Sequence, residues 1–126
     1  MGCSVVRGIR GAITVEQNDA AGIMAAVKEL LLTMINVNQI QVEDIASIIF
    51  STTSDLDAAF PAKAARDLGW TNVPLLDLQQ MQVPGAMKRC IRVLMHVNTK
   101  LRQAEIKHIY LREAKELRPD LVDNNT

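Results

Sequence analysis

The stretch CIRVLMHVNT, residues 90–99, alternates between apolar and other side chains with the period of a β-strand. One face carries Arg92, which is flanked by strong strand formers. We therefore expect a strand in the middle of a sheet. Because an unpaired charge is costly to bury, we also expect the Arg92 guanidinium to have a partner. The opposite face carries four apolar residues, Ile91, Val93, Met95 and Val97.

Other strands are expected on both sides of this stretch. Pro74 limits one of them to an edge or an end of the sheet, because proline cannot donate to a central ladder. Pro84 and Gly85 predict a turn between two strands. In the last strand, Ile106 and Tyr110 are expected on one face together with His108. The four predicted strands cover residues 4–15, 45–53, 73–78 and 106–113.

Two main helices are expected between the strands. Residues 18–35 place apolar side chains at helical spacing, and Asn18 or Asp19 can cap the start of this helix. Residues 55–70 predict a shorter helix, with Pro61 in its first turn and a glycine to end it. Residues 113–117 predict a last helical turn, and residues 36–44 a polar connection.

Strands and helices mix without a strict βαβ rhythm, and the chain contains no repeat and no linker. This pattern predicts one α+β domain over residues 1–126, with a mixed sheet and two main helices on one face of it. Residues from about 122 to 126 are expected to form a flexible tail.

Composition limits the possible functions. The 126 residues include 14 basic and 14 acidic side chains, and this balance gives no general attraction to nucleic acid or to an anionic membrane. Cys3 and Cys90 are too few and too far apart for a disulfide framework, and no spacing indicates a metal site. We expect His96 and His108 at the surface or an interface. We find no secretory signal and no apolar run long enough to span a bilayer, so we expect a cytoplasmic protein.

The strand arginines need a local explanation. Arg10 lies between two glycines, where a ligand or another backbone can approach closely, and Tyr110 supplies a hydroxyl. Arginine captures carboxylates with two parallel hydrogen bonds, so several converging arginines predict a small polyanionic ligand. Such a site fits a ligand sensor or an enzyme that works by electrostatic stabilisation and conformational restraint. The alternative is that Arg7, Arg10, Arg92 and Arg112 are edge or interface residues whose stems cover apolar surface.

Five stretches resemble, in this order, the monofunctional chorismate mutases of the Bacillus type. They are RGIRGAITVE, DLDAAFPAKAARDLGW, VPLLDLQQMQVPG, CIRVLMHVNT and HIYLREAKELRPDL, and the match runs from about Val6 to Leu121. The resemblance implies a homotrimeric pseudo-α/β barrel with active sites between neighbouring subunits. It implies conversion of chorismate to prephenate by a Claisen rearrangement, on the route to phenylalanine and tyrosine, without a metal or an organic cofactor. Chorismate carries two carboxylates, a ring hydroxyl and an ether oxygen that gains negative charge during the reaction.

The resemblance also implies roles for individual residues. Arg92 matches the arginine that meets the ether oxygen and a carboxylate, and Arg10 and Tyr110 match the pair that holds the side-chain carboxylate. Further substrate-binding positions match Phe60, Ala62, Lys63 and Arg66 from a neighbouring subunit, Leu76 in the pocket lining, and Leu117 and Arg118 in the segment that closes over the pocket.

One position departs from the family pattern. Better-known members carry a glutamate, facing the ring hydroxyl, where this chain has Gln80, and a cysteine or small polar residue at Asp77. We hypothesise that Asp77 takes over the role of the glutamate and that Gln80 is a neutral hydrogen-bonding neighbour. The alternative is that Asp77 points to solvent or caps the following turn.

Two other functions are compatible with arginines in a subunit cleft. A trimeric imine hydrolase of the Rid type is one, but it lacks the CIRV and HIYLREA stretches in this arrangement. A non-catalytic homologue that binds a small anion is the other, although the joint presence of Arg10, Arg92 and Tyr110 argues against it.

Overall fold

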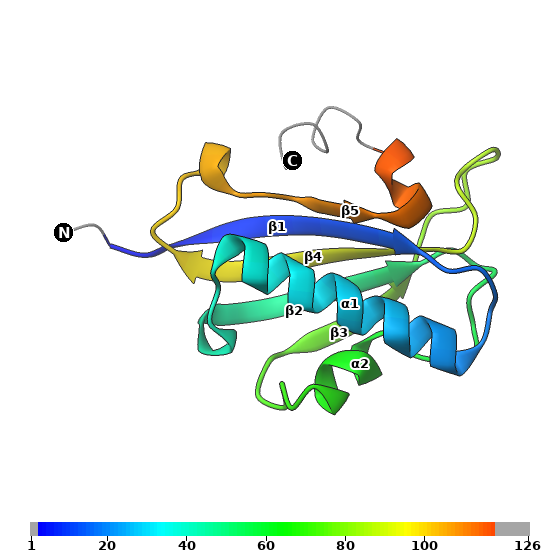
Figure 1. Cartoon of the computed structure of the whole chain (residues 1–126), viewed down its shortest axis with the longest axis horizontal. Helices are drawn as coiled ribbons and strands as arrows, with labels where there is room; N and C mark the ends of the chain where they lie inside the picture. The colour runs from blue at the N-terminus through cyan, green and yellow to red at the C-terminus, as the bar shows by residue number, and fades with distance from the viewer. Residues whose placement is uncertain (1–2, 118–126) are drawn as a thin grey trace.

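The computed structural model describes residues 3–117, which form a five-stranded mixed sheet and two α-helices, as the sequence predicted. Arg118 and the tail from residue 122 lie outside the described residues. Short 3₁₀ turns, η1 (Val42–Asp44), η2 (Gln103–Glu105) and η3 (Arg112–Glu116), join the main elements. In chain order the main elements are β1 (Val5–Thr14), α1 (Ala20–Asn38), β2 (Ile45–Thr52), α2 (Ala62–Asp67), β3 (Leu75–Gln79), β4 (Cys90–Thr99) and β5 (Ile109–Leu111) (Figure 1).

The strand that contains Arg92 is central, as predicted. The sheet order is β3-β2-β4-β1-β5, and β4 pairs antiparallel with both β1 and β2. The outer strands β5 and β3 pair parallel with β1 and β2, so the strand that begins after Pro74 lies at an edge. This register places Arg92 opposite Ala12 of β1 and Ser51 of β2.

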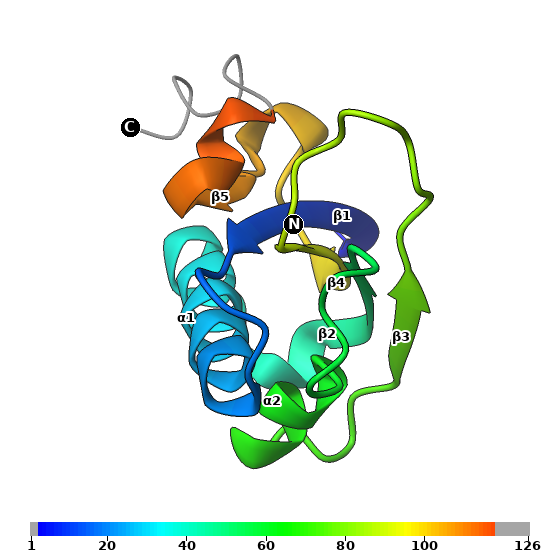
Figure 2. The same cartoon turned by 90° about the vertical axis from the view of Figure 1, so that its right-hand side faces the viewer.

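The core lies between α1 and one face of the sheet. Both helices lie on the same side of the sheet, and the loop between β3 and β4 arches away from them (Figure 2). Gly11 allows the closest approach of β1 to α1, because a Cβ atom at this position would lie 2.6 Å from Sδ of Met34. The buried face of α1 includes Ile23, Val27, Leu30, Leu31 and Met34, the residues whose spacing predicted the helix.

The first helix differs from the prediction at its end and in its hydropathy. It continues through Asn38, because the Asn38 side-chain amide donates to the carbonyls of Met34 (2.9 Å) and Lys107 (2.8 Å) and so stabilises the last turn. Its length and composition also suffice to cross a membrane, contrary to the expectation that no such run exists. Its buried residues pack on the sheet, as they do in a core helix of a soluble protein.

The second helix is shorter than predicted, because the segment before it is held as a loop. The Asn18 side-chain oxygen accepts from the backbone N–H groups of Asp57 and Ala58, both at 3.1 Å. Asp19, not Asn18, caps α1, and its carboxylate accepts from the Gly22 N–H at 2.6 Å. Pro61 directly precedes α2.

The last strand is also shorter than predicted, and the expected face of Ile106, His108 and Tyr110 is wrong. β5 contains only Ile109–Leu111. Ile106 packs with Ile109 in the main core, whereas Tyr110 belongs to a second apolar cluster. The η2 turn and the hydrogen bonds between Asn38 and the Lys107 backbone keep this segment out of the β-ladder.

Candidate active site

Arg92 lies in a hollow on the sheet face that carries no α-helix among residues 3–117. We call it the Arg92 hollow, and its volume is about 450 Å³. It brings together Arg10 of β1, Tyr110 of β5 and Leu117, which follows η3. The other lining residues are Gly11, Ala12, Ile49, Ser51, Val93 and Leu94.

The strand register explains why these side chains meet. Ala12 is the direct neighbour of Arg92 on one side and of Tyr110 on the other, so the three residues form one row across the sheet. The side chain of Ala12 is small, so the two larger groups can reach into one space above it. Ser51 continues the row on the other side of Arg92. This row depends on pairing between distant strands and could not be read from the sequence, although the alternation along each strand could.

The charge of the Arg92 hollow is positive. Arg10 and Arg92 are both exposed, and none of the described residues that line the hollow is acidic. Tyr110 is only 9% exposed and packs with Ala12, Cys90 and Ala114 in the second apolar cluster. Two guanidinium groups and a tyrosine hydroxyl held beside apolar walls suit a small ligand with several carboxylate groups.

Cys90 lies beneath Arg92 on the same face of β4 and is fully buried. Burial raises the pKa of the Cys90 thiol, and the nearby charge of Arg92 and its hydrogen bond to the sulfur oppose that shift. The thiol therefore stays neutral and serves as an uncharged neighbour for the guanidinium.

A second hollow of about 490 Å³ lies along the loop before α2 and the edge strand β3. Phe60 lines it and is 70% exposed, which is unusual for so large an apolar side chain. Asp77 also lines it. Because Asp77 of β3 pairs with the buried Phe50 of β2, its side chain lies on the sheet face that packs against the helices. The structure therefore does not bring Asp77 into the Arg92 hollow.

Asp77 has a defined partner in its own chain. Its Oδ1 accepts from the backbone N–H of Ala62 at 3.0 Å, at the start of α2. Partial burial raises the pKa of the Asp77 carboxyl above its ordinary value of 3.8, while the Ala62 hydrogen bond and the charge of Arg66 pull it down. This contact differs from the stated alternative, because Asp77 does not cap the turn that follows it but the start of α2, which precedes it in the chain.

Gln80 directly follows β3 (Leu75–Gln79) and lines a separate hollow of about 310 Å³, not the Arg92 hollow. Its backbone N–H donates to the Thr52 carbonyl at 2.8 Å. Its Oε1 is buried without a hydrogen-bond partner, the one such side-chain atom within residues 3–117. A buried acceptor without a donor is costly, so a donor that reached Gln80 Oε1 would relieve this cost.

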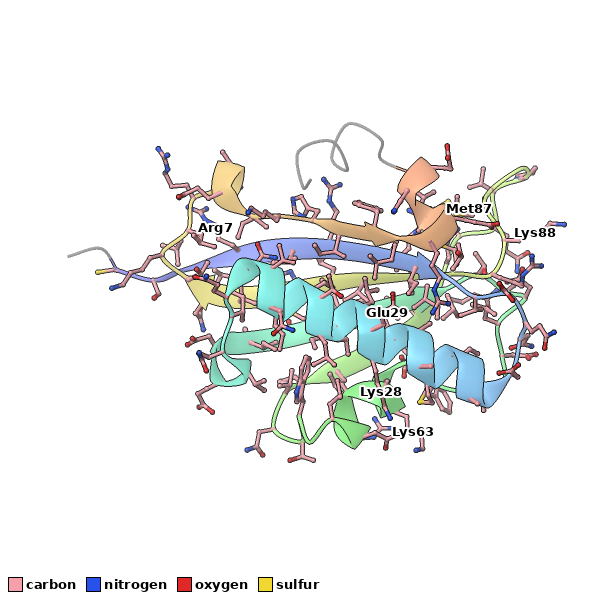
Figure 3. All side chains as sticks on the ribbon, viewed as in Figure 1. Arg7, Lys28, Glu29, Lys63, Met87 and Lys88 are labelled. Atoms are coloured by element: carbon pink, nitrogen blue, oxygen red, sulfur yellow. The ribbon has the colours of Figure 1, made fainter. Side chains whose placement is uncertain are left out.

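The remaining candidates lie around α2 and β3. Lys63 pairs with Asp67 at 3.2 Å, and Lys28 of α1 approaches the same carboxylate at 3.8 Å (Figure 3). Arg66 is exposed on α2, and Leu76 is 53% exposed on β3. None of these side chains lines the Arg92 hollow of its own chain, so a shared site would need a second copy to bring them there.

Arg7 makes a structural contact in β1. Its Nε donates to the Leu101 carbonyl at 3.1 Å, and it does not line the Arg92 hollow. Within residues 3–117 no three His, Cys, Asp or Glu side chains gather closely enough to hold a metal ion.

Comparisons with known proteins find similarity to a single family. The sequence model of the family "Chorismate mutase type I" matches residues 6–121. The chain is 52% identical over 118 residues to "Chorismate mutase AroH" of Thermus thermophilus, covering 93% of this chain and 97% of the relative. It is 47% identical over 118 residues to "Chorismate mutase AroH" of Bacillus subtilis (strain 168), covering 93% of each. Among solved structures, "Chorismate mutase from Clostridium thermocellum Cth-682" superposes with a TM-score of 0.86 at 50% identity, over 87% of this chain and 98% of that one.

Proposed function

The chain belongs to the type I chorismate mutase family, and on this premise we propose that the Arg92 hollow is where it converts chorismate to prephenate. The chain is a chorismate mutase with chorismate as its substrate, and the comparisons do not support a Rid-type imine hydrolase or a non-catalytic anion binder. What we propose is how its residues carry out the rearrangement.

The observation that carries the proposal is the convergence of Arg10, Arg92 and Tyr110 on one hollow. Arg10 and Tyr110 hold the side-chain carboxylate of chorismate, while Arg92 contacts the ether oxygen and the other carboxylate. The negative charge on the ether oxygen grows as its C–O bond breaks, so the guanidinium stabilises the transition state more than the ground state. The same contacts restrain the flexible substrate in a reactive conformation.

We propose that Gln80, rather than Asp77, meets the ring hydroxyl. Gln80 directly follows β3 and has a buried acceptor oxygen without a donor in the described part of the chain, although in a single chain it lines a separate hollow and not the Arg92 hollow. Asp77 instead accepts from the Ala62 N–H at the first residue of α2, and so helps to position Phe60 before the helix and Lys63 and Arg66 within it for substrate binding. Leu117, with Arg118 beyond the described residues, closes the hollow.

We also propose that the active protein is a cytoplasmic homotrimer with sites shared between neighbours. The sheet face of Arg92 carries Leu76 (53% exposed) and Leu78 (48%) on the edge strand, and Phe60 is 70% exposed nearby. Such an apolar surface is unfavourable in water and typical of an interface. A second copy placed there would add Phe60, Ala62, Lys63 and Arg66 to the Arg92 hollow.

A continuous assay of chorismate loss by ultraviolet absorbance, run with and without a metal chelator, tests the proposal. We expect the same rate under both conditions, because the site uses only side chains of the protein. A rate that disappeared with chelator would contradict the cofactor-free mechanism. Tight binding of prephenate without turnover would contradict catalysis itself.

A further inference from the structure

His108 contacts the strand that carries Arg10. The backbone N–H of Arg10 donates to Nδ1 of His108 at 2.9 Å. The parallel pairing of β1 with β5 begins one residue later, at Gly11 and Ile109. The imidazole therefore supplies an acceptor to β1 just where the backbone pairing with β5 stops.

This contact requires a particular protonation state of the ring. An imidazole nitrogen accepts a hydrogen bond only when it carries no proton, so this contact needs the neutral His108 ring with its proton on Nε2. When the ring is protonated, both nitrogens become donors and the Arg10 N–H loses its acceptor.

The segment around His108 is also fixed on its other side. The Asn38 side chain, at the end of α1, donates to the Lys107 carbonyl and accepts from the Lys107 N–H, both at 2.8 Å. Ile106 is buried in the main core. The segment before β5 that carries the imidazole is therefore held in place. The contact of the imidazole with β1 fixes the position of Arg10 relative to Tyr110.

Among residues 3–117, charged groups lie near His108 on β1 and around the η2 turn. Together with Arg7 and Arg10 of β1, His108 lines a small hollow of about 300 Å³. The other described lining residues, from β1, β4 and the segment before β5, are uncharged. In the η2 segment Arg102 and Glu105 pair with each other at 3.4 Å, and Lys107, next to His108, is exposed.

We propose that His108 is a positioning residue for Arg10, and that it acts in its neutral form. The inference rests on the proposed role of Arg10 as a ligand for the substrate carboxylate. Protonation of His108 releases the Arg10 amide, which loosens the guanidinium and the β1–β5 register at the substrate. The enzyme then loses activity on the acid side of neutrality, although the rearrangement itself transfers no proton.

The test compares kcat/KM between pH 5 and pH 8 for the native sequence, His108→Asn and His108→Leu. Asparagine has a side-chain oxygen that can replace Nδ1 as an acceptor and does not titrate in this range. We expect His108→Asn to stay near native activity at pH 8 and to lack the acid fall. His108→Leu should lose about 2- to 10-fold in kcat/KM, mainly through KM, because one hydrogen bond is lost and the carboxylate contact is present before the transition state. His96→Asn, which removes the chain's only other histidine, should keep the acid fall.

A second measurement does not depend on activity. In ¹H–¹⁵N spectra, the Arg10 amide resonance should shift between pH 8 and pH 5 in the native sequence and not in His108→Asn. If His108→Leu fails to fold, these spectra and the pH profile of His108→Asn still decide the question. An unchanged acid fall in His108→Asn, or an Arg10 amide that does not respond to pH in the native chain, would overturn the inference. Failure of the proposed function would give a different result from failure of the His108 inference, because Arg10→Ala would then retain full activity.

Discussion

At the scale of a single residue, the role proposed for Arg92 is to supply a positive charge to a reaction that moves no proton. Its guanidinium lies in the Arg92 hollow beside Arg10, with the neutral thiol of Cys90 on the same face of the strand. No described lining residue of the hollow offers it a carboxylate, so its positive charge is available to the substrate. Preorganised charge of this kind is effective because it need not reorient while the C–O bond breaks.

Replacing Arg92 should therefore reduce kcat strongly without unfolding the protein. We expect Arg92→Ala to lower kcat by at least about 10²–10³-fold, the usual effect of losing one preorganised donor. Arg92→Lys should also be poor, because a point charge cannot reproduce the planar fork. Steady-state kinetics, with Arg102→Ala on the exposed η2 segment as the control, checks both. Near-native kcat in either Arg92 variant would refute the assigned role.

Asp77 gives a prediction for stability against pH. Burial raises the pKa of its carboxyl above 3.8, so the folded state keeps the proton to higher pH than the unfolded state does. Stability therefore decreases as the pH rises through the window between the two values. Asp77→Asn removes this dependence while its amide oxygen can still accept from the Ala62 N–H. We expect its stability relative to the native chain to increase from pH 3.5 to pH 7 in urea unfolding.

The same variant separates the two hypotheses about the ring hydroxyl. If Gln80 is the acceptor, Asp77→Asn keeps most of its activity and Gln80→Leu loses activity. A severe kinetic defect in Asp77→Asn, with partial recovery when Gln80→Glu is added, would instead identify Asp77 as the working carboxylate. Kinetics of the three variants at one pH decides between these outcomes.

At the scale of elements, the contact between β1 and α1 fixes the strand that carries Arg10. Gly11 and Gly8 lie in the same strand but in different surroundings. A Cβ atom at Gly11 would meet Met34 Sδ at 2.6 Å, whereas one at Gly8 would meet only the end of the Leu94 side chain, at 3.3 Å. The first contact lies within the packed core and the second on the opposite face.

Gly11→Ala should accordingly destabilise the protein by about 1–3 kcal/mol, since overpacking displaces β1 from α1. Gly8→Ala is the matched control and should cost less, because the Leu94 side chain can move. Adding Met34→Ala to Gly11→Ala makes space for the new methyl group and should recover part of the strain, although it removes packing of its own. Denaturant unfolding gives these values, and equal effects of Gly8→Ala and Gly11→Ala would contradict the explanation.

At the scale of the whole molecule, the proposed substrate contacts of one chain are divided between two separate hollows. The Arg92 hollow contains the cations and Tyr110, while Phe60 and Asp77 line a separate hollow at the edge of the sheet. Assembly of identical copies would bring the first hollow of one subunit against the second hollow of its neighbour. Exposed Leu76 and Leu78 on the edge strand would be covered by the same contact.

Mixed trimers test this arrangement. Arg66→Ala and Arg92→Ala subunits should each be inactive alone, but refolded together they should form some sites in which both arginines are native. We expect activity that neither parent shows, measured on assemblies whose mixed composition is verified by mass spectrometry. Verified mixed trimers without any recovered activity would count against shared sites.

The sequence by itself determined most elements and the reaction, and it predicted which residues form the site. The alternation of residues 90–99 predicted a central strand, and the proline before β3 predicted an edge strand. Both could be predicted from the sequence because the burial of one strand face and the missing proline N–H are local properties. The arginines among strand residues indicated a carboxylate ligand, and the resemblance of five stretches indicated the reaction.

Only the tertiary structure decided which residues meet. The extension of α1 to Asn38, the short β5 and the contact of Asp77 with Ala62 each depend on a hydrogen bond between segments far apart in the chain. The row of Tyr110, Ala12, Arg92 and Ser51 likewise depends on the register of four strands. The local pattern of apolar residues fixes which face a side chain takes, but partners across strands are set by the packing of the whole sheet against its helices.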